Sequence, residues 1–360
     1  MESTNIDKQN NAIDLAKFIC AILVVMIHIS PFGFYVKPNL IAYFNYVIQQ
    51  YLARLAVPFF FIASGYFLYR KTSLKNFSIE PTKKYAKKLL GHYIIWSVIY
   101  FPLNYIKFTN DERGMFHAVL LYIRDFIFVG SYRHLWYLNA TIFAVVLISV
   151  LLYKNVSPKK MLAAAYMLYF VGLFDRSWYG FIVPLKEAAP HIWNVLKFIQ
   201  MIIVTTRNGL FEGFLFVGIG MLFAFYEINI PKKKAFMGFA VSMVLMFFEV
   251  FILQYFKIIR GYEAYFFLVP AAFFMFSIVR DIRLPDNKIY KTLRILSSLI
   301  FYMHLWVEKI VGNILTTIND GLTDTFLCFV LTLLVTIIFA IIVMKLSNIS
   351  RFKWLKKFYV

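Results

Sequence analysis

The sequence predicts an all-α fold, a polytopic transmembrane helix bundle with about ten spans and both termini in the cytoplasm. Three observations predict it. The 360 residues are 61% hydrophobic and only 16% charged, whereas a soluble domain carries about 25% charged residues. Long apolar runs recur along the chain, and most Lys and Arg residues lie between these runs. The aromatic share of 20% suits lipid-facing surfaces and the aromatic belts of membrane interfaces.

A helix needs roughly 17–25 mainly apolar residues to cross a bilayer. Ten segments meet or approach this requirement: 12–34, 43–69, 89–106, 134–153, 161–174, 207–227, 235–256, 264–279, 295–312 and 322–344. The fifth is short and is expected to continue towards Tyr179. The apolar segment 116–129 is interrupted by Arg124 and Asp125, so it is predicted to form an interfacial or re-entrant helix. The longest outer loop, 175–206, is mixed and aromatic and is a candidate lid over the external mouth.

The distribution of basic residues predicts the orientation. The segments expected in the cytoplasm hold 25 Lys and Arg residues, and the segments expected outside hold 10. Cytoplasmic loops of membrane proteins carry such an excess, so an even number of spans fits best. The chain is therefore expected to form one multi-pass domain of the plasma membrane, 1–360, with its spans over about 12–344 and a basic cytoplasmic tail, 345–360.

The formal net charge of +20 bears on the partners. Strong positive charge can indicate nucleic-acid binding, but here the basic residues flank apolar runs. Membrane lipids with anionic headgroups are therefore the expected partner, and no nucleic acid is expected. The two cysteines, Cys20 and Cys328, lie inside apolar runs without metal-ligand spacing, so no metal is expected.

Lys17 and His28 share one face of the first predicted span. Eleven residues make about three turns plus roughly 20°, with a rise of about 16 Å. An ionisable residue inside a span costs about 2.5–3.5 kcal/mol on insertion scales. Imidazole exchanges a proton near neutral pH, so His28 is a candidate general base, with Lys17 near the cytoplasmic entrance. The alternative is a histidine that is satisfied by a neighbouring helix or by Ser30.

The second span carries Arg54 four residues before Pro58, and Ser64 directly before Gly65. An arginine inside a span must find an anion or backbone carbonyls, and Pro58 frees the carbonyl of Arg54 itself. Ser64 and Gly65 allow close helix approach. This segment is a candidate anchor for the helix face that carries the active site. The alternative is a packing kink whose arginine extends to the interface.

Lys84 and Lys87 precede the third span at i, i+3 spacing, so both project from one helix face. They are candidates to bind the phosphates of an acyl-coenzyme A at the cytoplasmic surface. The alternative is ordinary positive flanking of a span.

Later spans hold four further candidates for substrate binding. His134 opens the fourth span at the outer surface, either within reach of an acceptor or as part of an aromatic belt. Arg207 opens the sixth span and is expected to pair with another helix. In the ninth span His304 and Glu308 are i, i+4 and share a face. A carboxylate beside an imidazole orients it, so this pair is either catalytic or a buried hydrogen-bonded pair.

Together these motifs resemble the acyltransferase-3 family of membrane proteins over roughly residues 10–345. Four patterns carry the resemblance: Lys17 to His28, Arg54-x-x-x-Pro58-x-Phe60-Phe61-x-x-Ser64-Gly65-Tyr66, Lys84-x-x-Lys87, and Ser298-x-x-x-Tyr302-x-His304. Within the family, the runs 54–66, 132–138 and 206–211 are similar to the membrane module of vancomycin-resistance serine racemases. The soluble racemase domain of those proteins is not expected here.

The resemblance implies an O-acyltransferase that moves an acyl group, often acetyl, from cytoplasmic acyl-coenzyme A to a hydroxyl of a cell-envelope glycan or similar acceptor. Acetyl-coenzyme A would be a co-substrate, and no permanently bound cofactor is implied. By the same resemblance His28 would deprotonate the hydroxyl or carry the acyl group, Lys17 would tune it, and Lys84 and Lys87 would hold the coenzyme. Family members often have arginines at these two positions, and lysine is a weaker bidentate clamp.

Two other functions use the same intramembrane polar residues. A transporter would move a small polar solute such as serine, or export a polysaccharide. Transporters commonly show inverted repeats and broken helices, and no repeat is evident in this sequence. A structural or partner-binding membrane protein would leave the insertion cost of His28, Arg54 and His304 without a reason.

Overall fold

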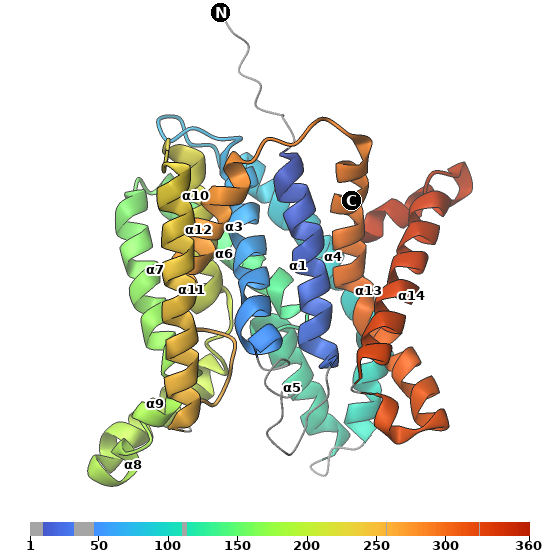
Figure 1. Cartoon of the computed structure of the whole chain (residues 1–360). Helices are drawn as coiled ribbons and strands as arrows, with labels where there is room; N and C mark the ends of the chain where they lie inside the picture. Colours follow the sequence, from blue (N-terminus) through green and yellow to red (C-terminus); the bar gives the residue numbers. More distant parts are fainter. Residues whose placement is uncertain (1–9, 32–46, 110–113, 257, 324) are drawn as a thin grey trace, which may run out of the picture. The chain divides into compact units, whose positions relative to one another are not determined.

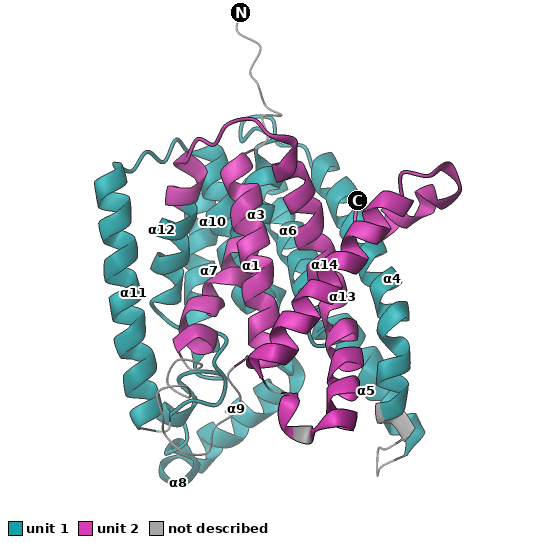
Figure 2. Cartoon of the chain, turned by 45° about the vertical axis from the view of Figure 1, so that its right-hand side comes forward, with its two compact units in different colours: residues 1–6, 61–276 teal, residues 7–60, 277–360 magenta. Residues whose placement is uncertain are grey.

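The computed structural model contains helices joined by turns and loops (Figure 1), and no β-strand occurs in the stretches that it describes. Those stretches are 10–31, 47–109, 114–256, 258–323 and 325–360. The prediction of an all-α fold is confirmed. The chain divides into two compact units (Figure 2), a terminal unit of Asp7–Phe60 with Ser277–Val360 and a central unit that contains Phe61–Phe276. The single domain over 1–360 stays a prediction.

Three long helices form the terminal unit: α1 (Asn11–Ile29), α13 (Lys288–Ile318) and α14 (Phe326–Leu346). Each of the three packs against the other two. Their shared core is aliphatic, with Val25 and Ile29 from α1 beside Leu299 and Ile300 from α13. Because the three helices bury these faces against one another, residues near the two ends of the sequence form one body. The unit also contains the short helices η5 (Asp320–Leu322) and η6 (Ser350–Phe358).

Asparagine and threonine caps set where these helices begin. The Asn10 side chain accepts a hydrogen bond from the Ile13 amide at the start of α1 and donates to the Arg280 carbonyl. Asn287 caps α13 and Thr325 caps α14 in the same way. A side-chain oxygen at this position satisfies an amide that the helix leaves unbonded. The Asn10 bond to Arg280 also ties the start of α1 to the segment that leads into α13.

The central unit is built from helices of its own and from parts of two helices that continue into the terminal unit. Its own helices are α4 (Glu80–Thr109), α5 (Met115–Phe128), α6 (Trp136–Tyr153), α7 (Pro158–Leu173), α8 (Leu185–Ala188), α9 (Pro190–Ile203), α10 (Phe214–Phe225) and α11 (Lys232–Tyr255), with the short helices η3 (Tyr179–Phe181) and η4 (Gly209–Gly213). The two shared helices are α3 (Ala56–Tyr69) and α12 (Leu268–Asp281).

Small and hydroxyl-bearing residues allow these helices to pack closely. A Cβ atom added at Gly65 of α3 would collide with the Val217 carbonyl of α10, so the predicted close approach at this glycine is confirmed. Ser149 of α6 hydrogen-bonds Tyr69 of α3 at 3.0 Å and Thr82 of α4 at 2.7 Å. Interhelical hydroxyl bonds of this kind are typical of helix packing in membranes.

Every one of the ten predicted spans contains a helix. Within the described residues, seven helices are long and apolar enough to cross a membrane: Asn11–Ile29, Ile48–Tyr69, Glu80–Ile106, Trp136–Tyr153, Lys232–Tyr255, Lys288–Ile318 and Phe326–Leu346. The other three predicted spans fall on the shorter helices α7, α10 and α12. These helices indicate a membrane protein, while ten spans and cytoplasmic termini stay predictions. Predicted span positions 32–34 and 43–46 lie outside the described residues.

Two predictions about connecting segments can be compared with the fold. The interrupted segment 116–129 forms one helix, α5, with Arg124 bonded to its neighbour Asp125 at 2.6 Å. The long loop 175–206 contains α8 and α9, which Figure 1 shows near the lower end of α7 and α11. Its role as a lid stays a prediction.

Candidate active site

Two imidazoles meet in the terminal unit. The ring centroids of His28 on α1 and His304 on α13 lie 5.2 Å apart, with their planes tilted by 38°. His28 is half-buried and His304 is fully buried. The sequence singles out both histidines, and the packing of α1 against α13 brings them together.

Backbone carbonyls fix the tautomer of His304. Its Nδ1 lies 2.9 Å from the carbonyl oxygens of Ile300 and Phe301. A carbonyl only accepts, so Nδ1 carries the proton and Nε2 of the neutral ring is the basic nitrogen. Glu308 lies half-buried one turn further along α13. The Nδ1 geometry shows that the preceding turn of α13 holds the ring through its backbone.

The other end of α1 carries a charged cluster around Lys17. Asp14, one turn before Lys17, is 1% exposed, and its carboxylate lies 3.8 Å from the guanidinium of Arg294 on α13. The charges of Asp14 and Arg294 both act on Lys17. Neither Asp14 nor Arg294 is among the residues predicted from the sequence, although Asp14 stands three residues before Lys17 on the same face.

Arg54 lies in a helical run that changes its winding just before Pro58. The run begins as a π-helix, η1 (Ile48–Leu52), tightens to a 3₁₀ turn, η2 (Ala53–Leu55), and becomes α-helical in α3. Arg54 Nη2 donates to Gln50 Oε1 at 2.5 Å, and Gln49 Nε2 donates to the Met26 carbonyl of α1 at 3.0 Å. The run is thereby fastened to α1 two residues before His28.

The remaining predicted positions lie in the central unit. Ser64 of α3 hydrogen-bonds the Tyr137 hydroxyl of α6 at 3.1 Å, a contact between packed helices. Lys84 and Lys87 lie exposed in the first two turns of α4. Neighbouring Lys83 pairs with Glu80 at 2.7 Å, whereas neither Lys84 nor Lys87 has an ion pair to another described residue. Both remain suited to an anionic ligand.

His134 is buried inside the central unit, and its place at the outer surface of the membrane stays a prediction. The residue is 2% exposed. Its ring packs edge-on against Tyr100 at 4.8 Å and Tyr132 at 6.1 Å between centroids. Edge-on packing of this geometry stabilises a buried ring, and a contact of His134 with an acceptor stays a prediction.

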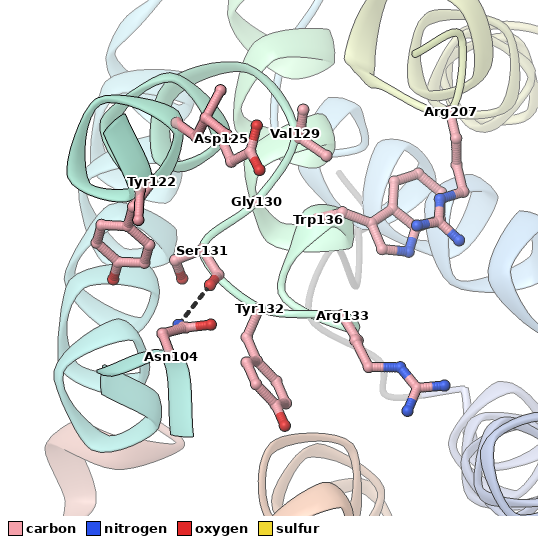
Figure 3. Close-up of a pocket in the computed structure, with 12 residues that line it drawn as sticks. Asn104, Tyr122, Asp125, Val129, Gly130, Ser131, Tyr132, Arg133, Trp136 and Arg207 are labelled. Carbon is pink, nitrogen blue, oxygen red and sulfur yellow. Dashed lines mark hydrogen bonds between the residues drawn. The ribbon is translucent and has the colours of Figure 1, made fainter. Parts of the chain in front are cut away.

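A pocket of about 320 Å³ is lined by residues on either side of His134 in the sequence, among them Arg133 and Trp136 (Figure 3). We call it the α5–α6 pocket. Its polar and aromatic lining residues are Asn104, Tyr122, Asp125, Ser131, Tyr132, Arg133, Trp136 and Arg207. The sequence predictions include only Arg207 from this set. The turn between two apolar helices is a signal that could have found Ser131, Tyr132 and Arg133, because binding residues concentrate on loops held by rigid elements.

The turn after α5 shapes this pocket. The Val129 and Gly130 amides both donate to the Asp125 carbonyl, which ends the helix. Gly130 has φ +122°, and a Cβ atom there would come within 2.5 Å of the Trp136 backbone. Only glycine fits this conformation and this contact. Asn104 then donates to the Ser131 carbonyl at 2.9 Å, the dashed bond in Figure 3.

Cations and aromatic rings give the pocket its chemistry. The Arg207 guanidinium lies 5.1 Å from the centre of the Trp136 ring and 3.3 Å from the Glu263 carboxylate. Glu263 lies in the loop before α12 and not on a helix, so the expected partner of Arg207 on another helix stays a prediction. Burial raises the pKa of Tyr122 above its ordinary value, so its phenol keeps a proton to donate. The pocket therefore offers stacking surfaces, hydrogen-bond donors and an arginine.

No group of three or more His, Cys, Asp or Glu side chains within the described stretches could hold a metal ion.

Comparison with known proteins gives three results. The model of the family described as "Acyltransferase domain", the acyltransferase-3 family, matches residues 10–345. An "Amino-acid racemase" of Enterococcus faecalis is 31% identical over 345 residues, 95% of this chain and 47% of the relative. A "Serine/alanine racemase" of Enterococcus gallinarum is 28% identical over 300 residues, 82% of this chain and 40% of the relative. The chain thus spans about half the length of these curated relatives or less. No solved structure matches the chain.

Proposed function

Because this chain belongs to the acyltransferase-3 family, we propose that it is a plasma-membrane O-acyltransferase. Acetyl-coenzyme A is the proposed donor, and a hydroxyl of a cell-envelope glycan or a similar acceptor is the proposed target. The family supports acyl transfer by an integral membrane enzyme. The observation that carries the proposal is the pair of imidazoles, His28 and His304, 5.2 Å apart in the interior of the terminal unit.

His28 acts as the general base in the proposed reaction. Its imidazole takes the proton of the acceptor hydroxyl as the oxygen attacks the thioester carbonyl. The carbon–oxygen bond forms, the carbon–sulfur bond breaks, and the coenzyme leaves as a thiolate that takes up the proton. His304 is a positioning residue whose ring is fixed through Nδ1. Lys17 lies on the same face of α1 as His28, and the negative charge of Asp14 balances its positive charge.

Two surfaces of the central unit supply binding in this proposal. Lys84 and Lys87, exposed on the first turns of α4, attract the coenzyme phosphates. The α5–α6 pocket binds the acceptor, because aromatic rings such as Tyr132 and Trp136 pack on the apolar faces of a sugar. Asn104 and Arg207 supply directional hydrogen bonds there.

The test measures release of free coenzyme A and transfer of label from radiolabelled acetyl-coenzyme A by the purified full chain. We expect His28→Ala to lower the rate by about 10²- to 10⁴-fold, the usual contribution of a general base. His191→Ala is the matched control, since His191 is exposed on α9, and we expect it to leave the rate unchanged. Equal rates for the wild type and His28→Ala would remove the catalytic assignment.

A second candidate function is import of an amino acid such as serine. The names of the relatives, amino-acid racemase and serine/alanine racemase, favour an amino-acid substrate. The α5–α6 pocket holds both charges that a zwitterion needs, with Arg133 and Arg207 for the carboxylate and Asp125 for the ammonium group. Uptake of labelled serine into proteoliposomes, without release of coenzyme A from acetyl-coenzyme A, would support the transporter and exclude the acyltransferase.

A further inference from the structure

A second pocket, of about 270 Å³, lies between α7 and α9 in the central unit and has no part in the proposed function. Its walls are almost entirely apolar and include Val171, Phe174, Trp193, Leu196, Ile203 and Phe211. A pocket of this composition binds hydrocarbon far better than it binds a polar solute. We call it the α7–α9 pocket.

Helix α9 exposes an apolar surface next to this pocket. Side chains that do not line the pocket are more than half exposed: Ile192, Val195, Phe198, Met201 and Ile202. A helix with one such face suits the boundary between headgroups and hydrocarbon. The pocket beneath α9 is therefore positioned to take a chain from the membrane itself.

A half-buried cation stands in the lining of the pocket. Lys197 Nζ lies 4.7 Å from the centre of the Trp193 ring and 5.4 Å from the centre of the Tyr179 ring. It donates to the Tyr179 hydroxyl at 3.2 Å and to Gln200 Oε1 at 3.0 Å. No carboxylate of a described residue pairs with it. A cation among aromatic rings without a counter-ion suits an incoming anion.

A strained turn holds α9 in this position. Val204, directly after α9, has φ +65° and ψ −48°, and the Thr205 amide donates to the Ile203 carbonyl at 2.7 Å. This is the rare γ-turn, and such a residue costs about 1–3 kcal/mol. The Thr205 hydroxyl accepts from Arg176, and the next residue donates to the Asp175 carboxylate. These bonds fix the wall of the pocket against the strain.

We propose that the α7–α9 pocket binds one hydrocarbon chain of an anionic membrane lipid, whose phosphate is bound by Lys197. The apolar walls take the chain, and the ammonium group, next to Tyr179 and Trp193, takes the headgroup. A free phosphate ion would leave the walls unfilled, and a zwitterionic lipid would bring its own cation to Lys197. The occupant is therefore a bilayer lipid with net negative charge.

The test uses the full chain in phosphatidylcholine nanodiscs. A trace of phosphatidylglycerol with a photoreactive acyl chain is crosslinked, and the labelled peptides are compared with those from matched phosphatidylcholine. We expect label on α9 and on the Val171–Phe174 segment. Phosphatidylglycerol should give about fivefold more label than phosphatidylcholine, which corresponds to one interaction between a lysine and an anionic lipid. Equal labelling by the two lipids in the wild type would overturn the proposal.

Two matched pairs of variants sharpen the result. Lys197→Gln should bring phosphatidylglycerol labelling down to the phosphatidylcholine level, whereas Lys186→Gln, on exposed α8, should not. Leu196→Trp fills the pocket and should remove the label from both lipids. Val195→Trp, which points away from the pocket, should preserve it. Unchanged labelling in Lys197→Gln, or loss of selectivity on addition of inorganic phosphate, would contradict binding of a lipid headgroup.

Discussion

The two compact units of this chain carry different kinds of chemistry. The terminal unit holds groups suited to proton transfer, with His28 facing His304 and with Lys17 next to the opposite charge of Asp14, which also pairs with Arg294. The central unit holds pockets lined by aromatic rings and cations, where a ligand can be held without proton transfer. The difference predicts that substitutions in the terminal unit lower kcat, while substitutions in the central unit raise KM or lower the affinity.

The largest effect should come from the two imidazoles. His28→Ala should lower kcat by about 10²- to 10⁴-fold, and His304→Ala by about 10- to 100-fold, as expected for a residue that orients another. Residues that act as one unit are not additive. The double variant should therefore be no slower than His28→Ala alone in the acetyl-coenzyme A assay. If the fold losses in kcat of the two single variants multiplied in the double variant, His28 and His304 would act independently and not as one unit.

The next effect should come from the turn that shapes the α5–α6 pocket. Gly130→Ala places a methyl group against the Trp136 backbone, at about 1–3 kcal/mol of strain. This should raise KM for the acceptor about tenfold or more and lower the thermal unfolding midpoint. Gly114→Ala is the control, because Gly114 also has positive φ but a Cβ atom there meets nothing within 4 Å. An equal change of KM for the acceptor in the two variants would show that the pocket does not bind the acceptor.

The smallest effect should come from the exposed lysines of α4. Lys84→Ala combined with Lys87→Ala should raise KM for acetyl-coenzyme A several-fold, and added salt should shrink the difference, because exposed charges are screened. Lys232→Ala combined with Lys233→Ala removes the same charge at the exposed start of α11. An unchanged KM in the α4 variant, or an equal change in the α11 variant, would show that Lys84 and Lys87 do not bind the coenzyme and only flank a span.

Hydropathy predicted the helices well, because each span has an apolar surface of fixed length that must be buried in the protein or exposed to lipid. Even α5, interrupted by Arg124 and Asp125, was predicted as a helix. The sequence also singled out His28 and His304, but as members of separate patterns. Periodicity assigns a residue to a face of its own helix. It does not say which helix that face meets, so only the packing of α1 against α13 reveals the pair.

Other parts of the site depend on contacts between distant segments, which spacing cannot show. Arg294 meets Asp14 because of the same helix packing. Glu263, the partner of Arg207, lies in a loop without a motif. His134 opens a predicted span, and its packing against Tyr100 and Tyr132 does not follow from that position. Burial of a short turn segment is a tertiary property and follows from its neighbours.

Chemical rescue can show whether the imidazole of His28 takes the proton of the acceptor. Radiolabelled acetyl transfer would be measured for wild type and His28→Ala, each with and without imidazole in the buffer. We expect added imidazole to raise the rate of His28→Ala about tenfold or more over its residual rate and to leave the rate of the wild type unchanged. A His28→Ala protein that transfers acetyl at the wild-type rate without imidazole would contradict this role of His28.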